Sequence, residues 1–234
     1  MHDGQNLFDV QKGSAGKEWQ VDENMQKLIS ENKIRESIVV GIWNTGMKRH
    51  SEYFPQKAID YISQGQRKYL VSLMPNLPLG DNYLRFITTE LKPFIDITFS
   101  TYPDRPNTFI CGSSMGGLIS LYALCEYPEI FGGAGCISTH WIGTFDNNPE
   151  IPEGINEYLR RNLPSPYNHK IYFDYGTLGL DANYQPHQAL VDKTMEEKNY
   201  DKSCWITLEF PEEDHNEKFW SARLHHPLIF LLGN

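Results

Sequence analysis

The chain has 234 residues, 40% hydrophobic and 22% charged, which excludes a disordered or fibrous protein and suffices for one substantial core. A formal net charge of -9, with lysine and arginine scattered, excludes the basic footprint of a nucleic-acid-binding protein. No stretch approaches the roughly 20 apolar residues of a membrane-spanning helix, so we expect a soluble chain, cytoplasmic as given, although a missing amino terminus could have carried a signal peptide.

Short apolar runs that predict buried strands alternate with helical patterns along the chain. The strands are expected at residues 37–43, 108–112, 133–138, 170–175 and 204–210. The helices are expected at residues 22–34, 83–97, 117–126, 187–199 and 216–232, with Pro93 bending the second. This alternation predicts a single α/β domain over residues 1–234, with a mostly parallel sheet, helices on both faces, and ligands bound beyond the carboxyl ends of the strands.

The segment 139–166 interrupts the alternation with several proline, asparagine and glycine residues around a short expected helix at 155–161. Loops of this length are often functional. Two interpretations stay open, a cap or lid over the substrate and an ordinary surface insertion.

The cysteines and histidines show no metal-ligand spacing. The cysteines lie in apolar runs, so we expect buried thiols rather than a disulfide framework. We expect neither a metal nor a cofactor. The four cysteines are Cys111, Cys125, Cys136 and Cys204.

The motif with the most specific chemistry is Gly112-Ser113-Ser114-Met115-Gly116, between a predicted strand and a predicted helix. A tight turn of this kind strains its central residue, exposes the hydroxyl and needs small neighbours two positions away on either side. Ser114 is therefore the predicted nucleophile, whereas the side chain of Ser113 is expected to point into the turn. The alternative is a junction that uses glycines only for packing.

Around this motif the chain resembles the putative esterase family of α/β-hydrolases, which includes esterase D, feruloyl and acetyl-xylan esterases, and enterochelin esterases. The resemblance covers nearly the whole length and follows the family's order. It implies an α/β-hydrolase fold and cleavage of a carboxylic ester through an acyl-enzyme, for example an acyl group on a carbohydrate. The matching stretches are residues 3–9, 40–42, Arg49, 52–55, 112–117, 127–128, 131–133, 215–217, Trp220 and Arg223.

A serine hydroxyl needs a base to take its proton, and histidine fits that task. In α/β-hydrolases the chain order is nucleophile, acid, histidine, with the histidine on a loop after the last strand. His169 precedes a predicted strand, and His225 and His226 fall within the predicted last helix. His215 follows the last predicted strand and is the predicted base.

The acid should follow the predicted strand at 170–175, because it must orient the imidazole and stabilise its positive form. Asp181 lies a few residues beyond that strand and is the predicted acid. Asp174 would lie within the strand. Asp214 is adjacent to the histidine in sequence, so its carboxylate would not readily face the imidazole ring.

The tetrahedral intermediate needs two backbone donors for its oxyanion. The amide of Met115, which follows the nucleophile, is one candidate. The resemblance places the second at residues 3–6, with the amide of Gln5 as the candidate. Without the resemblance, Asp3-Gly4 predicts only a turn.

Two other functions stay open. One is a peptidase or thioesterase on the same three residues, and the other is a non-catalytic binding module with this fold, which predicts loss of one of them. The expected partner is a small-molecule or carbohydrate ester, with no nucleic acid and no membrane. Trp43, Trp141 and His140 could line its pocket or pack in the core.

Met1 stands directly before His2-Asp3-Gly4-Gln5, whereas the resembling family reaches this turn only after its opening strands. We therefore expect the chain to lack N-terminal strands. Their loss would leave a neighbouring strand unpaired and let the Gln5 amide fray, which would reduce activity roughly a hundredfold. A misplaced start or a cloned fragment explains the position of Met1 equally well.

Overall fold

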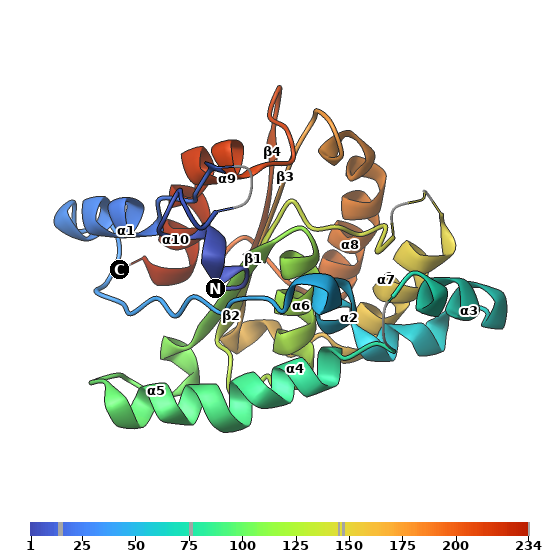
Figure 1. Cartoon of the computed structure of the whole chain (residues 1–234), viewed down its shortest axis with the longest axis horizontal. Helices are drawn as coiled ribbons and strands as arrows, with labels where there is room; N and C mark the ends of the chain where they lie inside the picture. The colour runs from blue at the N-terminus through green and yellow to red at the C-terminus, as the bar shows by residue number, and fades with distance from the viewer. Residues whose placement is uncertain (14–15, 75–76, 145, 147, 234) are drawn as a thin grey trace.

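A four-stranded parallel sheet forms the centre of the chain (Figure 1). The computed structural model describes residues 1–13, 16–74, 77–144, 146 and 148–233. The strand order is β1 (Phe109–Ser113), β2 (Gly133–Ile137), β3 (Lys170–Gly176) and β4 (Trp205–Phe210). The expected α/β class is confirmed. Because all four strands are parallel, their carboxyl ends meet at one edge of the sheet.

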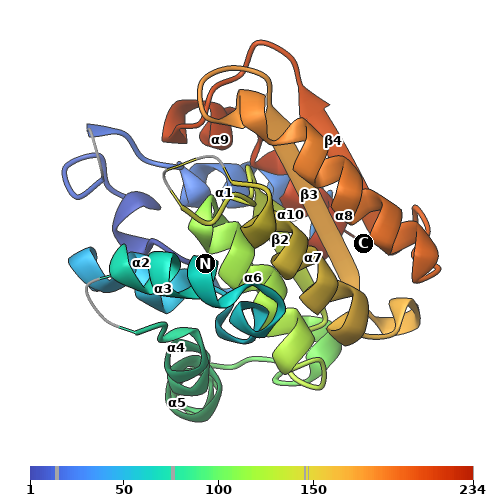
Figure 2. The same cartoon turned by 90° about the vertical axis from the view of Figure 1, so that its right-hand side faces the viewer.

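Helices cover both faces of this sheet (Figures 1 and 2). One face carries α1 (Val21–Ser30), α9 (Glu217–Arg223) and α10 (His225–Leu232), and the other carries α6 (Met115–Glu126), α7 (Glu150–Asn162) and α8 (Gln185–Glu197). Among the described residues, the other α-helices are α2 (Arg49–Tyr53), α3 (Gln64–Ser72), α4 (Gly80–Phe86) and α5 (Lys92–Thr98).

Strand side chains alternate between two hydrophobic cores, as the two-residue period of a strand requires. Ile110, Ile171 and Phe173 belong to the core under α6 and α7. Cys111 and Tyr172, each next to one of these in sequence, belong to the core with α1, α9 and α10. Burial on both faces explains why these strands are continuous apolar runs.

The predicted strand at residues 37–43 is wrong. Among the described residues its one bridge joins Ile42 to His2. His2 lies between Ile42 and the sheet, because its amide donates to the carbonyl of Cys111 in β1 at 2.9 Å. Ile38 and Trp43 are 52% and 60% exposed. The run has a strand-like sequence, but one bridge is too little pairing to form a ladder.

Prolines explain two departures from regular helix. Before Pro93, a π-helical turn, η5 (Ile87–Leu91), separates α4 from α5, where the sequence predicted one bent helix. Proline has no N–H for the carbonyl four residues earlier, so the regular bonding pattern fails there. Pro227 acts similarly: the predicted helix at 216–232 is divided, and α9 ends at Arg223, four residues before it.

The segment 139–166 contains α7, which is longer than the helix expected there. Trp141, Ile151 and Ile155 are buried, and α7 packs on α8 and on the 3-10 helix Gln56–Tyr61. Residues 145 and 147 lie outside the described residues. The helical part therefore belongs to the packed body, and a cap function for the segment stays a prediction.

The four cysteines carry free thiols. Cys111, Cys125 and Cys136 are buried as expected, whereas Cys204, which was also expected to be buried, is partly exposed. Within the described ranges, no helix is both long enough and apolar enough to cross a membrane.

Candidate active site

Ser114 occupies the turn between β1 and α6 in a conformation that few non-glycine residues adopt, with φ 58° and ψ -124°. Its amide donates to the carbonyl of Ile137 at 2.9 Å, and its carbonyl accepts from the amide of Gly117 at 3.0 Å. Ser114 is partly exposed, whereas Ser113 is only 4% exposed. The turn thus holds Ser114 directly after the carboxyl end of β1, and its role as nucleophile stays a prediction.

The glycines of the motif make this turn possible. A Cβ on Gly112 would lie 3.0 Å from the backbone of Gly116. A Cβ on Gly117 would lie 2.7 Å from Thr139 Oγ1 and 3.4 Å from the Cα of Cys136 in β2. Because Gly112 and Gly116 have no side chains, the turn can close. The absence of a side chain on Gly117 lets α6 approach the sheet.

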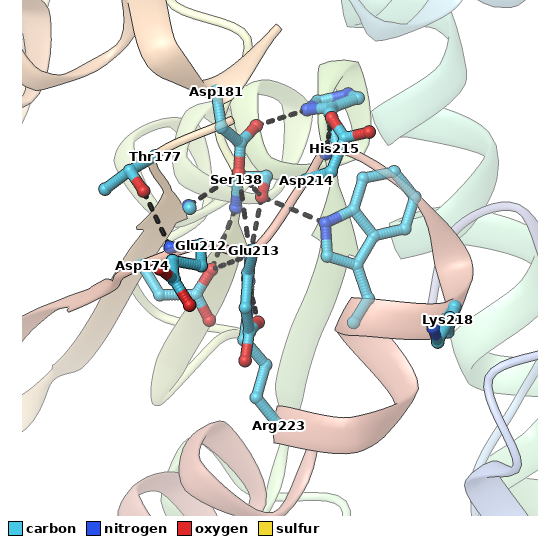
Figure 3. A network of polar contacts seen from close by, with 12 residues as sticks. Ser138, Asp174, Thr177, Asp181, Glu212, Glu213, Asp214, His215, Lys218 and Arg223 are labelled. Carbon is cyan, nitrogen blue, oxygen red and sulfur yellow. Dashed lines mark hydrogen bonds and ion pairs between the residues drawn. The ribbon is translucent and has the colours of Figure 1, made fainter. Parts of the chain in front are cut away.

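Asp181 and His215 follow the next strands, Asp181 after β3 and His215 after β4. His215 Nδ1 lies 2.5 Å from Asp181 Oδ1 (Figure 3). Since an ionised carboxylate only accepts, Nδ1 donates, and in the neutral imidazole the lone pair is then on Nε2. Burial alone would raise the pKa of Asp181, but hydrogen bonds from His215, Ser138 and the Gly176 amide hold it below its ordinary value.

The other two acidic candidates make different contacts. Asp174 is buried in β3 and binds Arg223 and the hydroxyl of Tyr172. Its burial raises its pKa, against the opposing effect of Arg223. Asp214 accepts the backbone amide of His215 at 2.7 Å and not the ring. Asp181 is thus the carboxylate that the structure brings to the imidazole.

Two residues, His140 and Tyr184, connect Ser114 to His215 through consecutive contacts. The amide of His140 donates to the Ser114 carbonyl at 3.2 Å, and its ring Nδ1 lies 2.7 Å from the hydroxyl of Tyr184. The Tyr184 ring meets the His215 ring edge-on, with centroids 5.7 Å apart. No hydrogen bond from Ser114 Oγ to His215 is recorded among the described residues. Such contacts are often long without substrate and tighten when it binds.

The side chain of His140 is buried and neutral rather than exposed. Its Nε2 lies 2.9 Å from the carbonyl of Thr144 and must donate to it, so Nδ1 accepts from Tyr184. Burial lowers the pKa of His140 to about 4. Trp141 is buried in the core and Trp43 is exposed.

The two candidate oxyanion donors belong to adjacent segments. A Cβ on Gly116 would lie 3.4 Å from His2 Cβ and 3.6 Å from Asp3 Oδ2, so the Asp3–Gln5 loop packs beside the turn of Ser114. Outside their own helices, no backbone carbonyl of the described residues accepts from the amide of Met115 or of Gln5. The role of these two amides as oxyanion donors stays a prediction.

The carboxylate of Asp3 holds this loop in place through hydrogen bonds and an ion pair. Its carboxylate accepts from Arg49 Nε and Nη2, each at 2.7 Å, and from Asn44 Nδ2 at 2.8 Å. Burial alone would raise the pKa of Asp3, but the bonds from Arg49 and Asn44 hold it below its ordinary value. The Asp3–Arg49 ion pair joins two parts of the sequence, residues 3–9 and Arg49, that matched the family as separate stretches.

The Gly4→Ala variant is expected to lower the free energy of unfolding by about 1–3 kcal/mol. A Cβ on Gly4 would lie 2.4 Å from the carbonyl carbon of Gly41 and 2.7 Å from the amide of Ile42, and backbone atoms cannot move aside as a flexible side chain can. Urea unfolding measures the difference. Gly65→Ala is the matched control in α3, where the new Cβ meets nothing closer than Ser63 Oγ at 3.8 Å. Equal stability of the two variants would contradict this packing.

Several groups around the site were not selected from the sequence. Ser138 and Tyr184 were missed, while Trp220 and Arg223 entered only as matches to the family. Ser138 is the last residue of the strand predicted at 133–138, which was the available signal, but nothing local showed which residue it would contact. No group of three or more histidine, cysteine or acidic side chains that could hold a metal occurs among the described residues.

A family model described as "Putative esterase" matches residues 1–231. The chain therefore belongs to this family. A relative, "Uncharacterized protein YbbA" of Bacillus subtilis (strain 168), is 28% identical over 167 residues, which is 66% of this chain and 61% of that protein. The chain thus spans about three fifths of this relative's length.

Solved structures show the same fold. The BES protein from Bacillus cereus has a TM-score of 0.70 at 19% identity, covering 100% of this chain and 81% of that one. A ferulic acid esterase has a TM-score of 0.62 at 16% identity, covering 92% of this chain and 77% of that one. The resemblance to the α/β-hydrolase fold that the sequence predicted is confirmed.

Proposed function

We propose that the chain is a carboxylic ester hydrolase that uses Ser114 as nucleophile, His215 as base and Asp181 as acid. The observation that carries the proposal is the contact of Asp181 with the far side of the His215 ring, at the sheet edge where the strained turn presents Ser114. Membership in the esterase family supports the reaction. The three groups follow three different strands, so the fold itself assembles them.

In this mechanism Ser114 Oγ attacks the ester carbonyl while its proton passes to His215 Nε2. The carbonyl oxygen, now negative, accepts hydrogen bonds from the amides of Met115 and Gln5. Collapse of the intermediate breaks the ester bond, and the leaving alkoxide takes the proton from His215. Water then attacks the acyl-enzyme with His215 again as base, which releases the acid and restores Ser114.

For the substrate we propose an acyl ester of a carbohydrate or another small molecule, such as an acetyl or feruloyl ester. A ferulic acid esterase is among the structural neighbours, which supports an aromatic acyl group. Thioesters and peptides remain the alternative substrates, because these three residues determine the chemistry and the pocket determines the substrate. A panel of p-nitrophenyl esters, acetylated and feruloylated sugars, a thioester and a peptide separates these classes.

Esterase activity is expected to rise with pH through one ionisation near neutrality. The base must be neutral to accept the serine proton, and histidine side chains ordinarily change charge between about pH 5 and 8. Initial rates on a p-nitrophenyl ester across that range test this. A flat profile from acid to alkaline pH, or a fully active His215→Ala protein, would exclude His215 as the base.

A further inference from the structure

The hydroxyl of Ser138, directly after β2, lies at the centre of a buried polar network (Figure 3). Its Oγ lies 2.6 Å from Asp181 Oδ2, 2.7 Å from Arg223 Nη2 and 2.9 Å from Trp220 Nε1. All four side chains are less than 10% exposed. Three elements therefore converge on one oxygen: β2, the turn after β3, and α9.

The chemistry of these neighbours determines where the Ser138 hydrogen points. A guanidinium and an indole N–H can only donate, and a serine hydroxyl has one hydrogen and two lone pairs. Arg223 and Trp220 therefore occupy the two lone pairs. The single hydrogen is left for Asp181, whose ionised carboxylate only accepts.

This hydrogen bond also orients the carboxylate. Asp181 Oδ2 accepts from the Ser138 hydroxyl and from the Gly176 amide at 2.7 Å. Oδ1 is then left to face His215 Nδ1. We infer that Ser138 is a positioning residue for Asp181, an inference that rests on the proposed function of Asp181 and His215.

The backbone of Ser138 supports the same role. Its φ of 41° lies in the left-handed region that favours glycine. Its amide donates to the carbonyl and to Oδ1 of Asp174, at 2.9 and 3.1 Å. These two hydrogen bonds to Asp174 in β3 hold the Ser138 backbone in an energetically unfavourable conformation. In that conformation the Ser138 hydroxyl contacts Asp181.

The loss of the Ser138 hydroxyl would act on Asp181 within a crowded set of charges. A carboxyl group that loses a hydrogen-bond donor has a higher pKa. Its negative charge is also less neutralised by its surroundings, so it holds a proton on the neighbouring imidazole more strongly. Both effects move the acid limb of the activity profile to higher pH. The titratable and charged groups around Asp181 are His215 and Asp214 on the loop after β4, Glu213 beside them, Arg223 on α9, Asp174 on β3 and Tyr184 before α8.

The test is the rate at which an alkyl p-nitrophenyl phosphonate labels Ser114, measured from pH 5 to 9 with mass spectrometry of the labelled peptide. Ser138→Ala and Ser138→Gly are both expected to react about ten- to hundredfold more slowly at pH 7, since a hydrogen bond to a charged group is lost. Their acid limbs are expected to move up by about one pH unit. Glycine tolerates the positive φ, so equal shifts in both variants assign the effect to the hydroxyl rather than to backbone strain.

Thr194→Val is the matched control. Thr194 Oγ1 is a buried hydroxyl on α8 that contacts Asn156 Oδ1 at 2.9 Å and Arg160 Nη2 at 3.5 Å, away from the proposed catalytic residues. Its loss is expected to leave the acid limb in place. Should Ser138→Ala fail to fold, Ser138→Cys keeps the size and a weak donor, and a smaller shift in the same direction is expected.

The outcomes separate two failures. A wild-type protein that is not labelled at Ser114 would overturn the proposed function, and with it the role of Ser138. A wild-type protein that is labelled, with Ser138 variants that lose rate equally at every pH, would overturn only the positioning role and leave Ser138 as a structural residue.

Discussion

Replacement of Ser114 by alanine is expected to lower kcat on short-chain p-nitrophenyl esters by at least about a thousandfold, because only the oxyanion donors and substrate binding would remain. The effect should fall mainly on kcat, since the hydroxyl acts in the transition state. Initial rates over a range of ester concentrations separate kcat from KM.

Ser113→Ala is the matched control for this variant. Ser113 is the neighbouring serine of the same motif, 4% exposed at the end of β1. Loss of its hydroxyl is expected to change kcat by less than about tenfold, as for a group outside the reaction. Near-normal activity of Ser114→Ala would refute the nucleophile assignment, and a reversed ranking would move it to Ser113.

The Asp181→Asn variant is expected to lose about a thousandfold or more in kcat with little change in overall structure. An asparagine amide that donates to His215 Nδ1 would place the imidazole in the wrong tautomer, with a hydrogen on the nitrogen that must accept the serine proton. Steady-state kinetics at pH 7 to 8 measure the loss, and circular dichroism confirms that the variant is folded.

Two controls use the other acidic candidates. Asp214→Asn alters a carboxylate that holds the backbone amide of His215, so a small loss of activity is expected. Asp174→Asn removes a charge beside buried Arg223 and should lower stability more than turnover. If either control lost more activity than Asp181→Asn, the acid would have to be reassigned.

Local sequence signals predicted the parts of the fold that depend on local chemistry. The glycines around Ser114 predicted a strained turn, because only small residues fit two positions on either side of it. The order of strands placed Asp181 and His215 on loops after β3 and β4, and parallel strands bring such loops to one edge. The catalytic roles of these residues stay predictions.

The strand predicted at 37–43 shows where this reasoning fails. The apolar run of that segment has the composition of a strand, but a strand exists only through hydrogen bonds to a partner, and the sequence does not reveal how many bonds the partner offers. Here that partner is His2, with a single bridge to Ile42. Pro93 was correctly expected to disturb its helix, since the missing N–H is a local property.

By itself, the sequence determined the α/β class, the turn at Ser114 and the chain order of the candidate catalytic residues, because each follows from local periodicity or from residues close in sequence. Only the tertiary structure decided that Asp181, rather than Asp174 or Asp214, meets the imidazole, and that Ser138 joins Asp181 to Arg223. These contacts span 34 to 85 residues. They depend on the side-chain direction and register of neighbouring strands, which no local pattern specifies.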